Sequence, residues 1–213
     1  MPDELSARPE RKATIRLGQR ELSRISLTVI LLISAGLLFA GYRLFLGFKS
    51  QRDITLARAN LHTISVGLSA YAQDWNGKLP PAERWQETVA GFLPSSGGRN
   101  SGAGSVYSAP GDGADVGYVY NELAAGYNLE PTDKEHDRQK KLPLDQLILV
   151  IERTGAPLNS HVLIPAQGDA QGEAALYKVL DFPHNASDPQ KATTVLLYAN
   201  GSVVTRTKQD FAH

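Results

Sequence analysis

The feature that most constrains this chain is an apolar block near its N-terminus. From Ile25 to Tyr42 the sequence ISLTVILLISAGLLFAGY runs for eighteen residues without a charge, and LFLGF after Arg43 extends the apolar stretch to Phe48. A bilayer core of roughly 30 Å needs about 20 helical residues, which this block supplies if the Arg43 side chain reaches the interface. A buried soluble helix normally carries a polar stripe, and a cleaved signal peptide has a shorter apolar region. We therefore predict a transmembrane helix over residues 24–48.

Basic residues on both sides of this block predict its orientation. Six precede it and four follow it closely: Arg8, Arg11, Lys12, Arg16, Arg20 and Arg24, then Arg43, Lys49, Arg52 and Arg58. The flank richer in Lys and Arg usually stays in the cytoplasm. The pattern predicts a cytoplasmic polar tail over residues 1–23 and an extracytoplasmic domain over residues 49–213, at a bacterial inner (cytoplasmic) membrane.

The helical pattern continues beyond the apolar block. No proline occurs from Ser50 to Leu79, and apolar residues recur at spacings of three and four: Ile54, Ala57, Leu61, Ile64, Leu68 and Tyr71. This spacing places them on one helical face. Asn76-Gly77 and then Pro80-Pro81 supply a stop. The sequence predicts one helix of roughly 24 to 75, with a transmembrane part followed by an amphipathic part.

Shorter patterns predict the rest of the domain. AERWQETVAGFL indicates a helix with Trp85, Val89 and Phe92 on one face, and strands are predicted around Tyr118 and Tyr120 and over Leu147–Ile151. HVLIP and AALYKVLDF are weaker strand candidates. These elements predict an α+β fold in which the long helix packs on a small antiparallel sheet of four or five strands.

A β-hairpin near the C-terminus is the most strongly specified local structure. Two runs rich in β-branched residues, Thr193–Tyr198 and Ser202–Thr207, flank Asn200-Gly201. Both turn residues tolerate a positive φ, which a type I′ turn requires at its two central positions. We expect the apolar side chains of this hairpin (Val195, Leu197 and Val203) to pack on Ile64, Leu68 and Tyr71.

Composition narrows the possible chemistry. The 22 basic and 22 acidic residues balance, so no global charge attracts nucleic acid, and the absence of cysteine excludes disulfides and thiolate chemistry. The sequence has no phosphate-binding loop and no nucleophile motif. The best candidate for a divalent-ion site is LDFPHNASDP, with Asp181, His184 and Asp188. Because Asp and Asn also stabilise ordinary turns beside proline, we favour a turn over residues 181–188 and expect no cofactor and no enzymatic activity.

Interaction surfaces are suggested at three places. The small residues Ser34, Gly36, Ala40 and Gly41 could let a helix of another membrane subunit approach closely, although transmembrane helices are commonly rich in such residues. The charged segment 131–141 is either a docking surface or simply solvated. Three tyrosines, Tyr118, Tyr120 and Tyr127, could line a ligand-binding face or could belong to the core.

Several motifs in order resemble a known family. They are NLHTISVGLSAYAQDWNGKLP (Asn60–Pro80), VYSAPGD (Val106–Asp112), GYVYN, PLDQLILVIE and TVLLYANGSVV. Together they cover about residues 54–207 and resemble the pseudopilin-like proteins of the type II secretion G-like group, which carry a C-terminal H-x9-DG signature. The resemblance implies a pilin-like domain in which a sheet covers the exported half of the helix.

The sequence also departs from that family. Arg16 stands where a prepilin leader would end in glycine if Glu21 were the fifth mature residue, fifteen residues separate His184 from Asn200, and Asn200 replaces the aspartate of the signature. We therefore expect an unprocessed structural or accessory subunit of a membrane protein complex. The alternatives are a processed pseudopilin of a type II secretion or type IV pilus-like system, and a membrane-tethered ligand-binding module.

Overall fold

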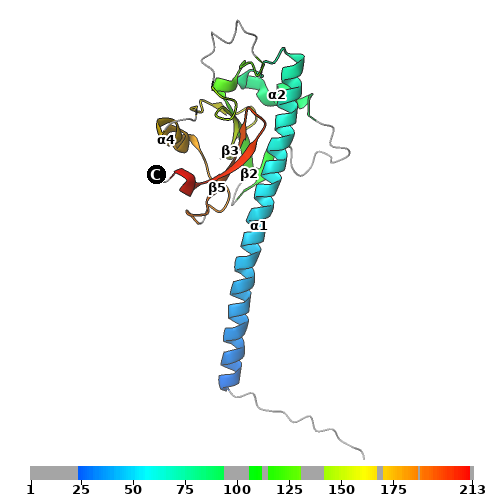
Figure 1. Cartoon of the computed structure of the whole chain (residues 1–213). Coiled ribbons are helices and arrows are strands. Elements are labelled where there is room, and N and C mark those ends of the chain that lie inside the picture. The colour runs from blue at the N-terminus through cyan, green and yellow to red at the C-terminus, as the bar shows by residue number, and fades with distance from the viewer. Residues whose placement is uncertain are drawn as a thin grey trace, which may run out of the picture. The chain divides into compact units, whose positions relative to one another are not determined.

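One long helix dominates the secondary structure (Figure 1). The structure is a computed structural model that describes residues 24–93, 106–111, 115–130, 142–166, 170–186 and 188–211. Helix α1 spans Arg24–Asp74, which confirms the predicted helix. The chain divides into two compact units, residues 1–44 and residues 45–213, and α1 contributes to both.

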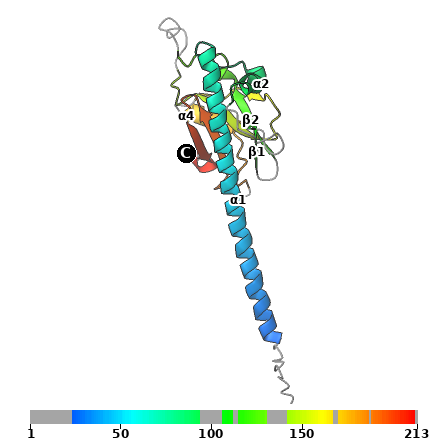
Figure 2. The same ribbon diagram turned by 90° about the vertical axis from the view of Figure 1, so that its right-hand side faces the viewer.

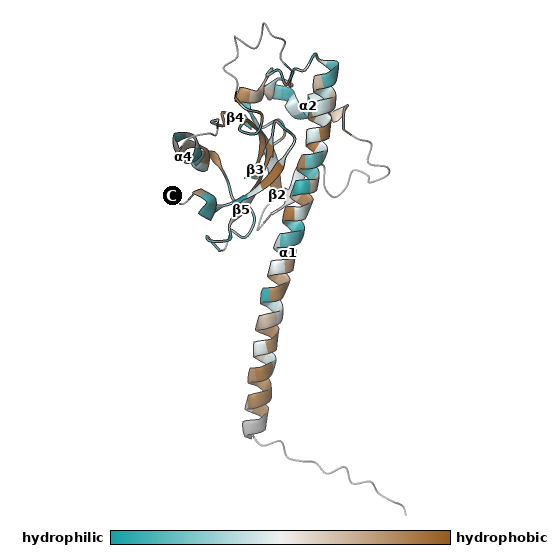
Figure 3. Cartoon of the chain, in the orientation of Figure 1, coloured by the Kyte–Doolittle hydropathy of each residue, from teal (hydrophilic) through white to brown (hydrophobic). Residues whose placement is uncertain are grey.

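The two halves of α1 have opposite surroundings. Every residue from 27 to 48 is exposed, and Figure 3 shows this part as mostly apolar. In the second half, the residues of the predicted apolar face are at most 9% exposed: Ile54, Ala57, Leu61, Ile64, Leu68 and Tyr71. Asn76 and Gly77 follow with positive φ values of 54° and 80°, and the Gly77 N–H donates to the Ala72 carbonyl at 2.7 Å. The left-handed residues therefore end the helix, as Asn-Gly predicts.

A six-stranded sheet packs on the second half of α1. Its order is β1-β2-β3-β5-β6, and β4 pairs with β2. The strands are β1 (Ser108–Pro110), β2 (Asp115–Asn121), β3 (Ile148–Thr154), β4 (His161–Val162), β5 (Thr193–Tyr198) and β6 (Val203–Thr207). All neighbours are antiparallel except β2 and β4, which run parallel. The α+β class is thus confirmed, whereas the expected purely antiparallel sheet is wrong, because β3 is followed by a loop that crosses β2 before β4 begins.

Apolar side chains fill both faces of the sheet. Figure 2 shows the second half of α1 crossing in front of the strands. On one face, Val195 and Leu197 share a core with Ile64 and Leu68 of α1, and Val203 packs against it, as predicted for the hairpin. The Tyr71 ring, which we expected there as well, contacts two other rings: it stacks on Trp75 and meets Phe92 edge-on, both at 5.4 Å. The second core, on the opposite face, includes Ile151, Leu196 and Leu176.

The remaining helices confirm one prediction and correct another. Short helix α2, Trp85–Ala90, follows a 3-10 turn at Ala82–Arg84 and buries Trp85 and Val89, as predicted, but it ends before Phe92, which we expected on the same helical face. The segment AALYKVLDF was expected to be a strand, but Ala170–Val179 forms helix α4. Leu176, Val179 and Leu180 recur at helical spacing and pack in the second core, and this tertiary contact favours helix over strand. Two further 3-10 turns lie at Glu122–Ala124 and Lys208–Phe211.

The hairpin turn also differs from the expected type. Gly201 has a φ of +82°, whereas Asn200 is not among the non-glycine residues with positive φ, so a type I′ turn is excluded. The Gly201 N–H donates to the Tyr198 carbonyl, and the Tyr198 N–H donates to the Ser202 carbonyl, both at 2.9 Å. These bonds define a three-residue loop with a left-handed glycine. The Asn200 side chain accepts from the Ser202 N–H at 2.9 Å, which stabilises this loop.

Candidate functional site

Most of the exposed large hydrophobic side chains in the described part of the chain lie on the first half of α1. Its most hydrophobic eighteen-residue window has a mean hydropathy of 2.1, and none of that window is buried. Leu37, Leu38 and Phe39 are 66–75% exposed. Exposed apolar surface on this scale is unstable in water. By length and composition this segment is compatible with a membrane span, as the sequence predicts for residues 24–48.

Several small residues lie on the exposed surface of the helix. Gly36 and Ala40 are four residues apart and therefore lie on the same helical face, and all four predicted residues, Ser34, Gly36, Ala40 and Gly41, are exposed. A Cβ atom built on Gly36 or Gly41 would meet no other atom within 4 Å. The surface at these residues is therefore uncovered within the described chain, and their role in helix packing stays a prediction.

The three residues of the 181–188 segment do not converge on one point. Asp181 accepts hydrogen bonds from the Thr154 and Phe182 N–H groups, both at 2.8 Å, whereas Asp188 contacts Lys191 Nζ at 3.0 Å. Burial opposes ionisation of Asp181, but the Thr154 and Phe182 bonds outweigh it and lower its pKa. Within the described residues no group of three or more His, Asp or Glu side chains could hold a metal ion. Asp181 and Asp188 are therefore held by separate partners.

His184 instead forms a buried pair with a residue of β3. Its Nε2 lies 3.1 Å from Oε1 of Glu152, and the two side chains are 1% and 0% exposed. The other oxygen, Oε2, accepts from the Val195 N–H of β5 at 2.7 Å. His184 also forms a backbone bridge with Thr193, donating and accepting at 3.2 and 2.8 Å. Glu152 thus links β3, β5 and the segment that precedes β5.

The surroundings of this pair indicate a structural role. Tyr118, opposite Glu152 in the β2–β3 register, is fully buried in the core beneath α1. Burial, and secondarily the Glu152 charge, raises the pKa of Tyr118 far above that of an exposed tyrosine. Both members of the His184–Glu152 pair are buried. Paired, hydrogen-bonded polar groups of this kind hold chain segments together.

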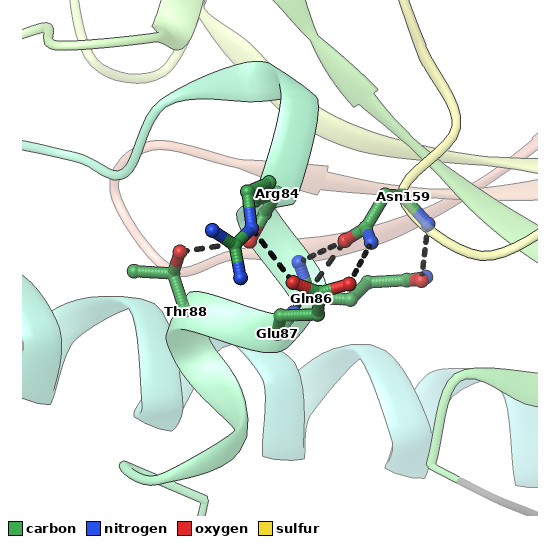
Figure 4. A network of polar contacts seen from close by, with 5 residues as sticks. All are labelled: Arg84, Gln86, Glu87, Thr88 and Asn159. Carbon is green, nitrogen blue, oxygen red and sulfur yellow. Dashed lines mark hydrogen bonds and ion pairs between the residues drawn. The ribbon is translucent and has the colours of Figure 1, made fainter.

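A second polar network joins the β3–β4 loop to α2 (Figure 4). Asn159 has a φ of +57°, and its Oδ1 accepts from the Gln86 N–H at 3.0 Å and from the Glu87 N–H at 3.4 Å. The Gln86 side chain in turn accepts from the Asn159 N–H at 2.6 Å. Arg84, which precedes α2, makes no capping bond of its own. Asn159 therefore acts as the N-cap of α2 from another part of the sequence, and the Trp85 indole N–H adds a bond to the Ser160 carbonyl at 3.1 Å.

Two shallow grooves flank this capping loop. One is lined by Gln86, Tyr107 and Gly117, and the other by Arg153 and His161, with Gly155–Leu158 contributing to both. Leu158 stands between them and is 74% exposed. The tyrosines proposed as a ligand-binding face are elsewhere: Tyr118 and Tyr120 are fully buried, and Tyr127 is partly buried with its hydroxyl donating to the Leu142 carbonyl at 3.1 Å. The tyrosine face is therefore a core feature and is not a binding surface.

Sequence reasoning missed Glu152 and Asn159. Glu152 could have been noticed as a glutamate at the end of an apolar strand, because a carboxylate buried there needs a hydrogen-bond partner. No local pattern identifies the second, whose partners lie more than seventy residues away. The predicted segments 1–23 and 131–141 lie outside the described residues.

Comparison with known proteins identified no relative of this chain. No protein-family model, curated protein or solved structure matches this chain. Its function is therefore argued from the geometry above.

Proposed function

We propose that this chain is a single-span membrane protein whose domain of residues 49–213 serves as a non-enzymatic structural or accessory subunit of a membrane protein complex. The observation that carries the proposal is the division of α1. Its residues 27–48 expose an apolar surface long enough to cross a bilayer, whereas the same helix from Ser50 onward forms the core of an α+β domain.

The polar sites of the domain support a structural role. The His184–Glu152 pair is enclosed, the Asp181 and Asp188 carboxylates serve turn and loop contacts, and the Asn159 network caps a helix. Each of these groups is used to join segments of the fold. The long helix, the sheet on its second half and the motif order also favour a pilin-like domain.

The proposal places residues 1–23 in the cytoplasm and the domain outside a bacterial inner membrane. Because the chain has no cysteine, single cysteines at Ser6 and Thr55 test this with a membrane-impermeant maleimide applied to cells with a permeabilised outer membrane. We expect labelling of Thr55→Cys and none of Ser6→Cys until the inner membrane is dissolved. Labelling of both cysteines while the inner membrane is intact would contradict a single span. Extraction of the chain from membranes by alkali would also contradict it.

The subunit role is tested by mild detergent extraction from native membranes, followed by sizing and intact-mass measurement. A full-length chain in a complex of defined size is the expected result. A chain shortened by a leader and recovered in filaments would instead establish a processed pseudopilin, which polymerises through its apolar helix.

A further inference from the structure

Three basic residues, Lys49, Arg52 and Arg58, follow the apolar segment of α1, and the one acidic residue close to them on the helix is buried. Between residues 24 and 73 the chain has five basic residues and one acidic residue, Asp53, although its overall charge is zero. The Asp53 side chain is 1% exposed, and its Oδ1 lies 3.4 Å from Nη2 of Arg52, whose side chain is 68% exposed. The carboxylate is thus turned into the domain, and the helix surface at Lys49 and Arg52 is basic.

The position of these two residues along the helix is equally distinctive. Phe48 is 73% exposed and ends the apolar segment, Lys49 follows it, and Ser50 is already buried. At 1.5 Å per residue, Lys49 and Arg52 lie within about 6 Å of Phe48 along the helix axis. The headgroup layer on each side of a bilayer is about that thick. If residues up to Phe48 are in the membrane, both basic side chains are at headgroup level.

We propose that Lys49 and Arg52 bind the anionic headgroups of phospholipids in the leaflet on the domain side. This inference rests on the proposed membrane span and adds the partner of this surface. Charge complementarity supports it, because a basic side chain close to an anionic membrane surface contributes about 1 kcal/mol of attraction. Basic residues next to a span oppose export of the segment that carries them. Their presence on the exported side therefore indicates a role there.

The test measures which lipids surround the helix at this level. Gly47 is the probe site, since a Cβ there meets no atom within 4 Å and the chain has no other cysteine. The full chain with Gly47→Cys, carrying a small fluorophore, is reconstituted into phosphatidylcholine vesicles that contain a minor fraction of phosphatidylglycerol. Bromine is placed on the acyl chains of either one lipid or the other, and the ratio of the two quenching efficiencies gives the local enrichment of the anionic lipid.

Three variants test whether lipid enrichment depends on Lys49 and Arg52 or on any basic residue of the helix. We expect enrichment of phosphatidylglycerol around the parent chain, and a decrease of at least about fivefold in Lys49→Gln/Arg52→Gln. The Lys49→Arg/Arg52→Lys variant should keep it. Arg58→Gln is the matched control and should lower the enrichment least, because Arg58 lies about 9 Å beyond Arg52 along the helix, outside the headgroup layer and close to one Debye length of about 10 Å at 0.1 M salt.

The outcomes distinguish this inference from the proposed function. Insertion without enrichment, or equal enrichment in the double Gln variant, would overturn the lipid proposal and leave the membrane span intact. The first of these results would reassign the basic pair to an acidic protein surface. A chain that does not float with the vesicles would overturn both proposals, because no span would then bring Lys49 to the headgroups.

Discussion

Replacement of Glu152 tests whether hydrogen bonding holds the three segments around His184 together. The carboxylate is fully buried, with Oε1 3.1 Å from His184 Nε2 and Oε2 2.7 Å from the Val195 nitrogen. Glu152→Ala leaves two buried polar groups unpaired, each costing about 1–3 kcal/mol, and also leaves a cavity. We expect a decrease in the free energy of unfolding of about 3–5 kcal/mol, the range for breaking a buried pair.

Glu152→Gln is the matched control. Its carbonyl oxygen can accept from the Val195 N–H, and its amide can donate to His184 Nε2 once the ring proton stands on Nδ1, a buried atom with no hydrogen-bond partner among the described residues. Both contacts are thereby kept without the negative charge, but one ring N–H is left unpaired. The expected decrease is about 1–3 kcal/mol, the cost of that unpaired donor, and is smaller than the decrease for Glu152→Ala.

Urea unfolding of the full chain in detergent micelles measures both changes. Trp85 is a suitable fluorescent reporter because it is fully buried and stacks on Tyr120 at 5.4 Å. The slope of the transition should stay constant, so that the midpoint reports stability. A Glu152→Ala variant as stable as the parent would refute the reasoning. Equal losses in the Ala and Gln variants would show that the negative charge, and not hydrogen bonding, stabilises this site.

Three further predictions follow from the same fold. Asn159→Gly keeps the left-handed backbone but loses the cap, so the free energy of unfolding obtained from urea unfolding should fall by about 1 kcal/mol. Asn159→Ala also strains the left-handed backbone, and the total decrease should be about 2–3 kcal/mol. Equal decreases in the two variants would argue against strain. In Gly117→Ala the new Cβ would be too close to the Ala156 carbonyl oxygen, so the melting temperature should fall. The control Gly91→Ala should leave the melting temperature unchanged, because Gly91 has open space around its Cβ and a right-handed φ of −71°. Similar melting temperatures of both variants would contradict the steric argument. Burial raises the pKa of Tyr107 from 10.0 to about 12, so the unfolded chain ionises first and stability should fall as pH rises from about 10 to about 12. Tyrosinate absorbance of the folded chain and of Tyr107→Phe checks this, and a Tyr107 signal that titrates at its ordinary pKa would contradict it.

The repeating patterns of the sequence were sufficient to predict most of the elements. The three- and four-residue spacing from Ile54 to Tyr71 predicted α1, and the apolar run at Leu147–Ile151 predicted β3. These predictions succeed because helical and strand periodicity are properties of neighbouring residues. The hairpin strands were also predicted, but the turn type was wrong, because Ala199 joins Asn200 and Gly201 in the loop and donates to the Leu147 carbonyl at 2.8 Å. That contact with a distant segment helps to fix the loop.

By itself, then, the sequence determined the long helix with its apolar and amphipathic halves and the α+β class. Only the tertiary structure decided which polar residues meet. Glu152 and His184 are 32 residues apart and Asn159 and Gln86 are 73 apart. It likewise placed the β3–β4 loop over Gly117, where a side chain would collide with Ala156. The physical reason is that periodicity identifies which side of an element is buried, whereas the partner of a buried polar group depends on how distant segments pack.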